Sequence, residues 1–194
     1  MDSLLPASSD AGRRPPAPGR LELLRTFINT VDLEAGDDDF ASVDALSQWL
    51  LLRDLLPPGT KLTEADRREA IAFRETVRVV LEANAGHGTD GNAVARLNAL
   101  AARVPLTLRL GATSTLEPER ATGIDAAVGR LLAIIHESVT LGTWRRLKVC
   151  RNDTCRWAFY DSSRNRSGAW CTMAICGNRM KGRAFRRRHP AAAG

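Results

Sequence analysis

The chain has 194 residues, which is enough for one medium-sized domain or for one domain with a small appendage. Hydrophobic residues make up 44% of it and charged residues 26%, a composition that excludes an entirely disordered protein. The longest apolar runs, such as residues 131–135, are too short to cross a bilayer, and the first twenty residues lack the apolar segment of a secretory signal. We therefore expect a cytoplasmic protein whose cysteine thiols stay reduced.

The net charge of +6 is distributed unevenly along the chain. Residues 144–194 carry 13 basic and 2 acidic side chains, whereas residues 1–143 carry 15 basic and 20 acidic ones. Most of the C-terminal cations are arginines, which suit bidentate contact with phosphates and with guanine edges. This asymmetry favours a nucleic-acid partner for the C-terminal part; the alternative is a solvated basic surface that only aids solubility.

The N-terminal part begins with a segment, residues 1–19, that is rich in Pro, Ser, Ala and Gly and predicts a disordered leader. Apolar residues at spacings of three and four then predict a helix that starts near Arg20. An acidic turn follows at residues 34–39. Ser42 can cap a second helix, and Thr63 begins a capping box for a long third one.

The remainder of the N-terminal domain, assigned to residues 20–142, is also mostly helical. Residues 85–91 are rich in glycine and end the long helix, and a fourth helix precedes a strictly alternating strand at residues 106–111. The residues after that strand can return as its partner and form one small β-hairpin. The last long helix carries Ile124 to Val139. The predicted fold is mainly α, with a small four-cysteine module at residues 144–190 that ends in a basic helix.

The four cysteines form two pairs with the same internal spacing, Cys150-x4-Cys155 and Cys171-x4-Cys176. Each pair can supply two thiolates to a tetrahedral site in which four sulfurs lie about 2.3 Å from one Zn²⁺ ion. A segment of about 45 residues is too small to fold on its hydrophobic core alone, and a metal supplies the missing stability. We therefore predict one structural zinc ion. Two disulfides, an iron–sulfur cluster and four unrelated buried thiols are the alternatives.

The residues after Cys171 predict a basic helix, which Thr172 can cap and which carries Cys176 in its early turns. A basic helix that a metal anchors at its N-terminus suits a DNA major groove, and the loop at residues 161–168 can add phosphate contacts. The candidate nucleic-acid contacts are Arg164, Arg166, Arg179, Lys181, Arg183, Arg186, Arg187 and Arg188.

Two sequence patterns surround the cysteines: W-x-F-x-D-x-S-R-N at residues 157–165 and W-C-x-M-x-x-C-G-N-R at residues 170–179. Together with the cysteine spacing, they resemble the CGNR zinc-finger family. Residues 27–32, FINTVD, resemble the opening motif of the ABATE domain, which is usually fused to this finger. The resemblance implies four zinc-binding cysteines, a DNA-binding finger and a stress-induced transcriptional regulator.

Further residues of these patterns are expected to support the zinc module. The amide of Asn178 can brace the zinc loop through hydrogen bonds to the backbone. Arg179 can pair with Asp161 and lock the helix, or it can face DNA. The full supporting set is Trp157, Asp161, Asn165, Trp170 and Asn178.

The sequence does not indicate an enzyme. His87 lies alone in a glycine-rich turn, and His136 follows an apolar run, which is typical of a boundary residue. The three aspartates at residues 37–39 crowd one turn without opposed partners. Asn29 and Thr30 can cap a helix or line an effector pocket, and the cap is the preferred interpretation.

We therefore predict a DNA-binding regulator, cytoplasmic and associated with the nucleoid, whose N-terminal domain senses a small-molecule effector or mediates assembly. A homodimer would strengthen the weak binding of one small module. The alternative classes are an RNA-binding module, a protein-interaction module and a thiol-redox-responsive finger.

Overall fold

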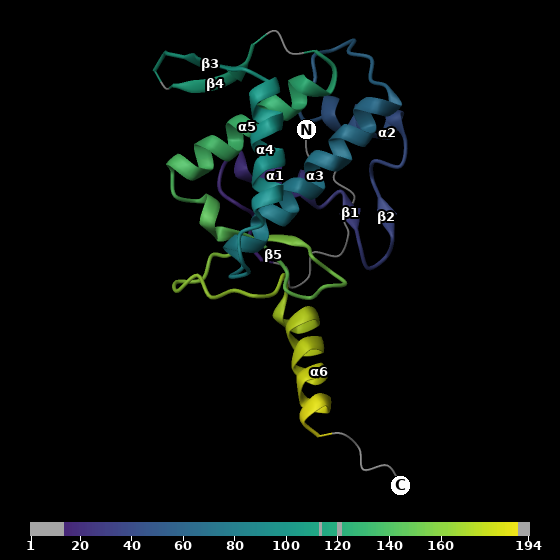
Figure 1. The fold of residues 1–194 in the computed structure, drawn as a ribbon, viewed down its shortest axis with the longest axis vertical. Helices are drawn as coiled ribbons and strands as arrows, with labels where there is room; N and C mark the ends of the chain where they lie inside the picture. Colours follow the sequence, from purple (N-terminus) through teal and green to yellow (C-terminus); the bar gives the residue numbers. More distant parts are fainter. Residues whose placement is uncertain (1–13, 113, 120–121, 190–194) are drawn as a thin grey trace, which may run out of the picture.

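The computed structural model describes residues 14–112, 114–119 and 122–189. Five helices form a body from which a sixth, α6 (Asn178–Arg188), projects on its own (Figure 1). The body helices are α1 (Leu21–Ile28), α2 (Val43–Leu51), α3 (Glu64–Asn84), α4 (Gly91–Arg103) and α5 (Gly123–Thr140). Within the described part of the chain, no helix is long and apolar enough to span a membrane.

The predicted starts of α2 and α3 are confirmed. In both helices a side chain accepts a hydrogen bond from one of the first backbone N–H groups, which have no partner within the helix. The Ser42 hydroxyl accepts a hydrogen bond from the Ala45 N–H at 3.1 Å. Thr63 and Asp66 form a complete capping box at the start of α3. A cluster of aromatic rings fills the core beneath these helices, with the Phe27 ring 5.6, 5.7 and 5.9 Å from the rings of Phe40, Trp49 and Phe73.

Within the described residues, three two-stranded antiparallel sheets complete the fold. The predicted hairpin is confirmed as β3 (Leu106–Arg109) and β4 (Thr115–Pro118). The predicted acidic turn lies in a second hairpin, formed by β1 (Val31–Asp32) and β2 (Asp37–Asp38). The third hairpin, β5 (Leu147–Val149) and β6 (Ala158–Tyr160), belongs to the cysteine-containing part of the chain. A 3₁₀ turn (Trp144–Arg146) and a π-helical turn (Met173–Gly177) precede β5 and α6, respectively.

The third hairpin shares the core of the body. Leu147 and Ala158 are fully buried, Val149 is 2% exposed, and all three belong to the same hydrophobic cluster as the body helices. We expected the cysteine module to rely on its metal for stability, because of its small size. The structure shows a second source of stability for the module, because one edge of it is packed against α3 and α1.

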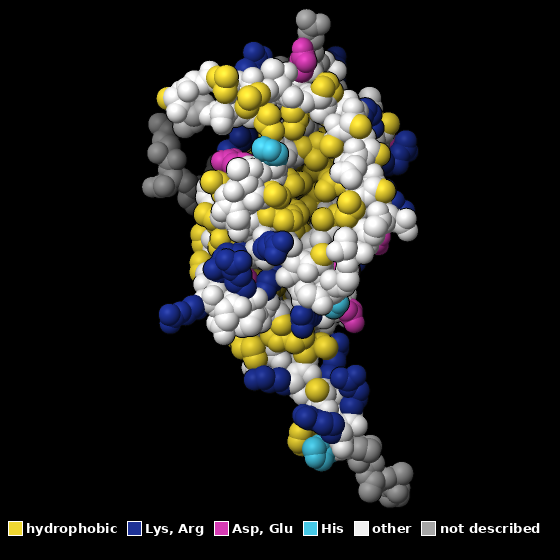
Figure 2. Space-filling view, turned by 60° about the vertical axis from the view of Figure 1, so that its left-hand side comes forward, with side chains coloured by type: hydrophobic (Ala, Val, Ile, Leu, Met, Phe, Trp, Pro, Cys, Tyr) yellow, Lys and Arg dark blue, Asp and Glu magenta, His cyan; other side chains and the backbone are white. Residues whose placement is uncertain are grey.

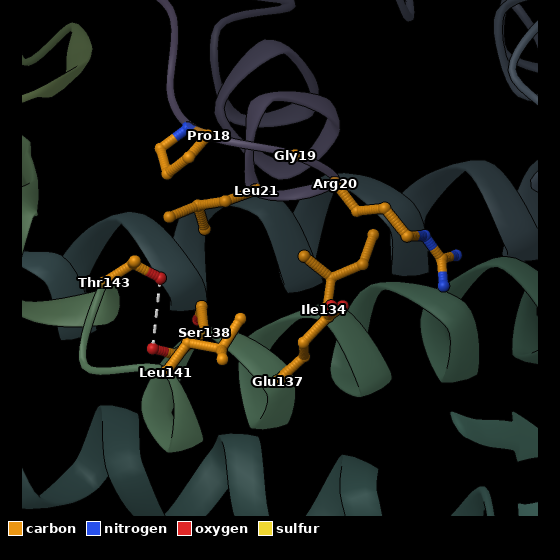
Figure 3. A pocket seen from close by; sticks show the side chains of 9 residues that line it. All are labelled: Pro18, Gly19, Arg20, Leu21, Ile134, Glu137, Ser138, Leu141 and Thr143. Carbon is orange, nitrogen blue, oxygen red and sulfur yellow. Dashed lines mark hydrogen bonds between the residues drawn. The ribbon is translucent and has the colours of Figure 1, made fainter. Parts of the chain in front are cut away.

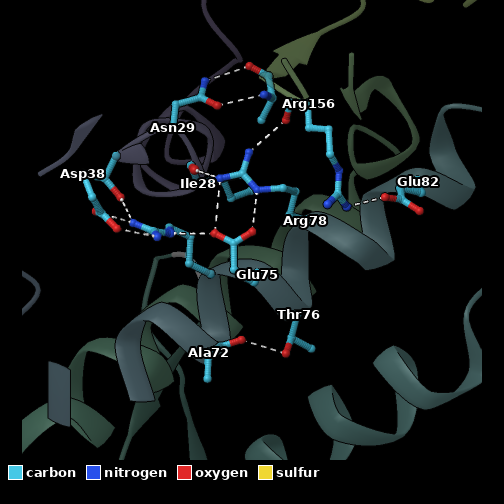
Figure 4. Close-up of polar contacts among 12 residues, drawn as sticks. Ile28, Asn29, Asp38, Ala72, Glu75, Thr76, Arg78, Glu82 and Arg156 are labelled. Atoms are coloured by element: carbon cyan, nitrogen blue, oxygen red, sulfur yellow. Dashed lines mark hydrogen bonds and ion pairs between the residues drawn. The ribbon is translucent and has the colours of Figure 1, made fainter. Parts of the chain in front are cut away.

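Buried polar contacts reinforce this junction (Figure 4). Arg78 of α3 is fully buried and donates hydrogen bonds to the carbonyl oxygens of Ile28 at 2.5 Å and Arg156 at 2.8 Å. Asn29 pairs with the backbone of Ala158 through two hydrogen bonds of 2.8 Å, as a neighbouring strand would. Asn29 caps a helix, as expected, because it is the residue at which α1 ends. It has a second role that was not expected, which is to bind the backbone of β6.

The end of the predicted leader also contacts the body and the cysteine module. Ala17 is 5% exposed, and the guanidinium of Arg14 donates to the Trp170 carbonyl oxygen at 3.2 Å. The prediction of disorder is therefore wrong for residues 14–19, because a cation and a small apolar residue find buried partners that composition alone does not reveal. Residues 1–13 lie outside the described residues.

We predict that Asn29→Ala destabilises the protein by about 1–3 kcal/mol, because it leaves the Ala158 N–H and C=O buried without partners. Denaturant-induced unfolding of the zinc-loaded protein measures this change. Asn98→Ala, at an exposed position of α4, is the matched control and is expected to stay within about 0.5 kcal/mol of the parent. Equal stabilities for the two variants would contradict the proposed pairing.

Candidate metal centre and nucleic-acid interface

The four cysteine sulfurs converge on one point. All four lie within 4.8 Å of one another, and Cys150, Cys171 and Cys176 are buried. The Sγ atom of Cys171 is 3.7 Å from that of Cys155 and 3.6 Å from that of Cys176. A regular tetrahedron with metal–sulfur distances of about 2.3 Å has edges of about 3.8 Å, so the observed spacing fits tetrahedral zinc. The distances exceed the length of an S–S bond, which excludes the disulfide alternative for this state.

Two loops of different construction present these sulfurs. The first is a tight turn in which the Asn152 carbonyl oxygen accepts hydrogen bonds from the N–H groups of Cys155 and Arg156, at 2.9 and 3.0 Å. Arg156 adopts a left-handed conformation there (φ 47°), and this aims its carbonyl oxygen at Arg78. The second is the turn before α6, where the Thr172 hydroxyl accepts from the Ile175 N–H at 3.0 Å, as predicted.

Asn152 is a functional residue that sequence reasoning missed. It is fully buried, and its amide donates to the Cys176 sulfur at 3.7 Å. Its carbonyl side-chain oxygen contacts Arg183 of α6 at 3.5 Å. Such contacts orient the ligands of a metal site and connect them with their surroundings. No feature of the sequence distinguishes this asparagine from an ordinary turn residue.

The close approach of the sulfurs opposes the ionisation of Cys155 and Cys171 in the absence of a cation. Hydrogen bonds from Cys155 and Cys171 lower the pKa of the Cys150 thiol to about 2. The bond to Cys150, together with burial, raises the pKa of Cys171 to about 12 and that of Cys155 even further. A four-thiolate site therefore requires a positive ion, and zinc binding must displace protons.

A second buried cluster, around Asp161, shapes the loop at residues 161–168. Asp161 is fully buried, and its carboxylate accepts hydrogen bonds from Lys148 Nζ at 2.8 Å, the Ser163 hydroxyl at 2.6 Å and the Gly168 N–H at 2.7 Å. Burial opposes its ionisation, but these bonds outweigh burial and hold the pKa of the carboxyl well below its ordinary range. Arg14 approaches the same carboxylate at 3.3 Å.

Gly168 makes this arrangement possible. A Cβ atom at this position would lie 2.8 Å from the Asp161 carboxylate, so any side chain would push the loop away from the cluster.

Lys148 is buried in the same cluster, with only 5% of its surface exposed. No sequence rule indicated this burial, because lysines are rarely buried unless they are paired. The cluster fixes the loop so that the side chains of Arg164 and Arg166 are exposed.

The predicted contact residues on α6 are exposed along its whole length. The helix has no buried residue, and several Lys and Arg side chains lie along the narrow projecting end of the molecule, between hydrophobic and other side chains (Figure 2). An open groove of about 520 Å³ runs along it, lined by Asp153, Met180, Arg183, Arg186 and Arg187. The structure thus places arginines of the helix beside the cysteine loop.

The predicted alternative that Arg179 pairs with Asp161 is wrong. Asp161 is occupied by Lys148 and Arg14, whereas Arg179 forms an ion pair with Glu34 in the β1–β2 hairpin. This contact joins residues 145 positions apart, and sequence spacing gave no sign of it. The Glu34 hydrogen bond and charge raise the pKa of Arg179.

The other expected supporting residues occupy three kinds of position. Trp157 and Trp170 are half-buried and pack against the cysteine cluster. Asn178 is exposed, and its amide donates to the Ala174 carbonyl oxygen at 3.1 Å within the turn that carries Cys176. Asn165 is exposed in the loop at residues 161–168. A Cβ atom on Gly177 would collide with the Met173 sulfur and lie 3.2 Å from the Trp170 ring, so this glycine permits close packing there.

Among its described residues, the body has no second group of three or more His, Cys, Asp or Glu side chains that could hold a metal ion. His87 and His136 are exposed, and Asp38 of the acidic turn pairs with Arg74 through two contacts of 2.7 and 2.8 Å. A small cavity of about 130 Å³ lies between the start of α1 and the end of α5, beside Leu21 and Ile134 (Figure 3). Thr30, where the sequence favours a helix cap over an effector pocket, is buried; its hydroxyl donates to the Phe27 carbonyl oxygen at the end of α1 and accepts a hydrogen bond from Arg74.

We predict that Asp161→Asn lowers the free energy of unfolding at pH 7 by about 3–5 kcal/mol, because it leaves Lys148 buried without its counter-charge. Thermal unfolding of the zinc-loaded variant measures the loss. Asp44→Asn, on the exposed face of α2, is the control for removal of one carboxylate. A loss no larger than that of the control would show that the carbonyl oxygens of Arg166 and Gly168, to which Lys148 Nζ also donates, suffice to stabilise the buried cation.

The raised pKa values of Cys155 and Cys171 predict a steep pH dependence of zinc binding. Because at least two thiols must lose protons, the apparent affinity is expected to fall about a hundredfold for each pH unit between pH 8 and pH 6. Competition with a chelator of known pH dependence measures this slope. A slope below one decade for each pH unit would mean that the thiols are already ionised without metal.

Comparisons with known families agree with this geometry. The family model of the CGNR zinc finger matches residues 146–189. The model of ABATE, described as "Putative stress-induced transcription regulator", matches residues 9–141. A search of curated proteins found no match. The finger match and the four clustered thiols together indicate a structural zinc ion. Because the ABATE match covers more than half of the chain, this protein belongs to the ABATE family and carries a CGNR zinc finger after that domain.

Proposed function

We propose that this protein is a transcriptional regulator that binds duplex DNA through α6 and the loop at residues 161–168. In this proposal Cys150, Cys155, Cys171 and Cys176 hold the structural zinc ion, which joins the two loops that orient the helix. The description of the ABATE family supports a regulatory role. The DNA-binding role rests on the surface chemistry of the described residues.

The single observation that carries the proposal is the exposure of α6. This helix of 11 residues has six basic and no acidic side chains, and none of its residues is buried. A helix of this length is marginally stable alone in water, and six like charges weaken it further. A polyanion along the helix would remove that repulsion, and a projecting helix has the dimensions of a major-groove probe.

The position of the aromatic rings favours duplex DNA over single-stranded RNA. Proteins that read single strands stack bases on exposed aromatic side chains. Here Phe159 is 2% exposed and packs in the cysteine cluster, and Tyr160 packs against the core of the body. The arginines of α6 are exposed instead, and they bind phosphates and base edges in a duplex. Phe185 is the exposed aromatic ring of this helix, at 58%, and it stacks on the ring of His189.

The N-terminal domain has a supporting role in this proposal, since it holds the finger through the shared core and the contacts of Arg78 and Asn29. Because one finger contacts few phosphates, we further propose that two copies act together on one operator in the cytoplasm, at the nucleoid. An effector that acts through the N-terminal domain would then alter how the finger is held.

We predict that Arg186→Ala combined with Arg187→Ala weakens binding to duplex DNA and lowers the slope of log affinity against log salt by about two units. Both side chains line the groove beside the helix and are far from the zinc site along the chain. Fluorescence anisotropy with a labelled random duplex measures affinity from 25 to 200 mM salt.

The matched control is Arg68→Ala combined with Arg96→Ala, which removes the same charge from exposed positions of α3 and α4. It is expected to change the slope little. If both pairs change it equally, the effect comes from net charge and the helix is not the contact surface. Tighter binding to a single-stranded RNA pool, or to an acidic protein with no DNA binding at low salt, would favour the alternative classes.

A further inference from the structure

The ion pair between Arg179 and Glu34 brings the acidic part of the N-terminal domain to the base of the basic helix. Both side chains are about half exposed, at 48% and 45%, so the contact lies at the surface where a ligand can reach it. Arg179 is in the first turn of α6, on the same face as Arg183 and Arg186 at spacings of four and seven residues. A polyanion that follows this face therefore meets Glu34 at its inner end.

Glu34 is held in this position by a well-organised turn. The Asp32 carboxylate accepts hydrogen bonds from the N–H groups of Glu34 and Ala35 at 2.9 and 3.0 Å. Gly36 adopts a left-handed conformation (φ 80°), and its N–H donates to the Asp32 carbonyl oxygen at 2.8 Å. The far strand is anchored in the core by the paired contacts between Asp38 and Arg74. The turn is thus an ordered hairpin that is fixed to the body, and not a free loop.

The chemistry of the contact is that of the ligand expected on α6. A carboxylate and a phosphate both present anionic oxygens to a guanidinium, and Arg179 cannot give its full set of hydrogen bonds to both. The neighbouring Asp32 and Asp37 add negative charge, which opposes the approach of a phosphate to this end of the helix. Such a competitor lowers affinity for any polyanion, and it does so from within the N-terminal domain.

We propose that Glu34 competes with phosphate for Arg179, so that docking of DNA exchanges the Glu34 carboxylate for a phosphodiester. This inference rests on the proposed function and specifies how the N-terminal domain regulates it. Any event that moves the β1–β2 turn away from α6 then raises the affinity of the finger. Any event that presses the turn onto the helix lowers it.

The test compares Glu34→Gln with Asp37→Asn in the full-length, zinc-loaded protein. Both substitutions remove one negative charge from the same turn, but the Asp37 side chain forms no hydrogen bond or ion pair with any described residue, so it reports the general charge effect. The probe is a labelled random DNA duplex. We expect Glu34→Gln to bind it about two- to fivefold more tightly than Asp37→Asn does, as suits release of one exposed ion pair.

The higher DNA affinity of Glu34→Gln relative to Asp37→Asn must vanish when Arg179 is replaced by Ala in both variants. The difference must persist when the exposed Arg188 is replaced instead. Zinc content and the helical signal in circular dichroism confirm that each variant is folded. Equal affinities of Glu34→Gln and Asp37→Asn would overturn the inference while leaving the proposed function intact. Absence of DNA binding by the parent protein at low salt would overturn the proposed function, and the inference with it.

Discussion

Four sulfurs that must share one cation impose the main constraint on this structure. Their spacing suits a tetrahedral ion, and the raised pKa values of Cys155 and Cys171 oppose the ionisation of these thiols in the absence of a cation. Each loop that brings a cysteine to this point must be fixed independently of the metal. In the first loop, this requirement is met by the turn at Asn152 and by the hydrogen bond from Arg78 to the carbonyl oxygen of Arg156. In the second loop, it is met by the cap at Thr172. The metal thus joins two loops that the protein has already shaped.

The finger is therefore not an independently packed domain. Its hairpin contributes Leu147, Val149 and Ala158 to the core of the body, and polar side chains of α1 and α3 bind its backbone. This construction leaves α6 as the one helix without buried residues among those described. A rigid base with a projecting basic helix is suited to present that helix to a large, charged partner.

The distribution of charge acquires a second meaning in the folded protein. Along the chain, an acidic part precedes a basic part, which by itself indicates only a polyanionic partner for the latter. In space, Glu34 of the acidic part reaches Arg179 of the basic part. The two regions are consequently able to influence each other through a single exchangeable contact, which offers a direct route from the N-terminal domain to the proposed DNA-binding surface.

The sequence by itself determined the features that depend on local spacing. The helix periods, the caps at Ser42, Thr63 and Thr172, the β3–β4 hairpin and the convergence of two equally spaced cysteine pairs follow from rules that act over a few residues. Only the tertiary structure decided the contacts made across many residues: Lys148 and Arg14 with Asp161, Asn29 with Ala158, and Glu34 with Arg179. Their physical reason is shared. A charged or polar side chain takes whichever partner the packing of distant elements brings within reach, and no local pattern encodes that choice.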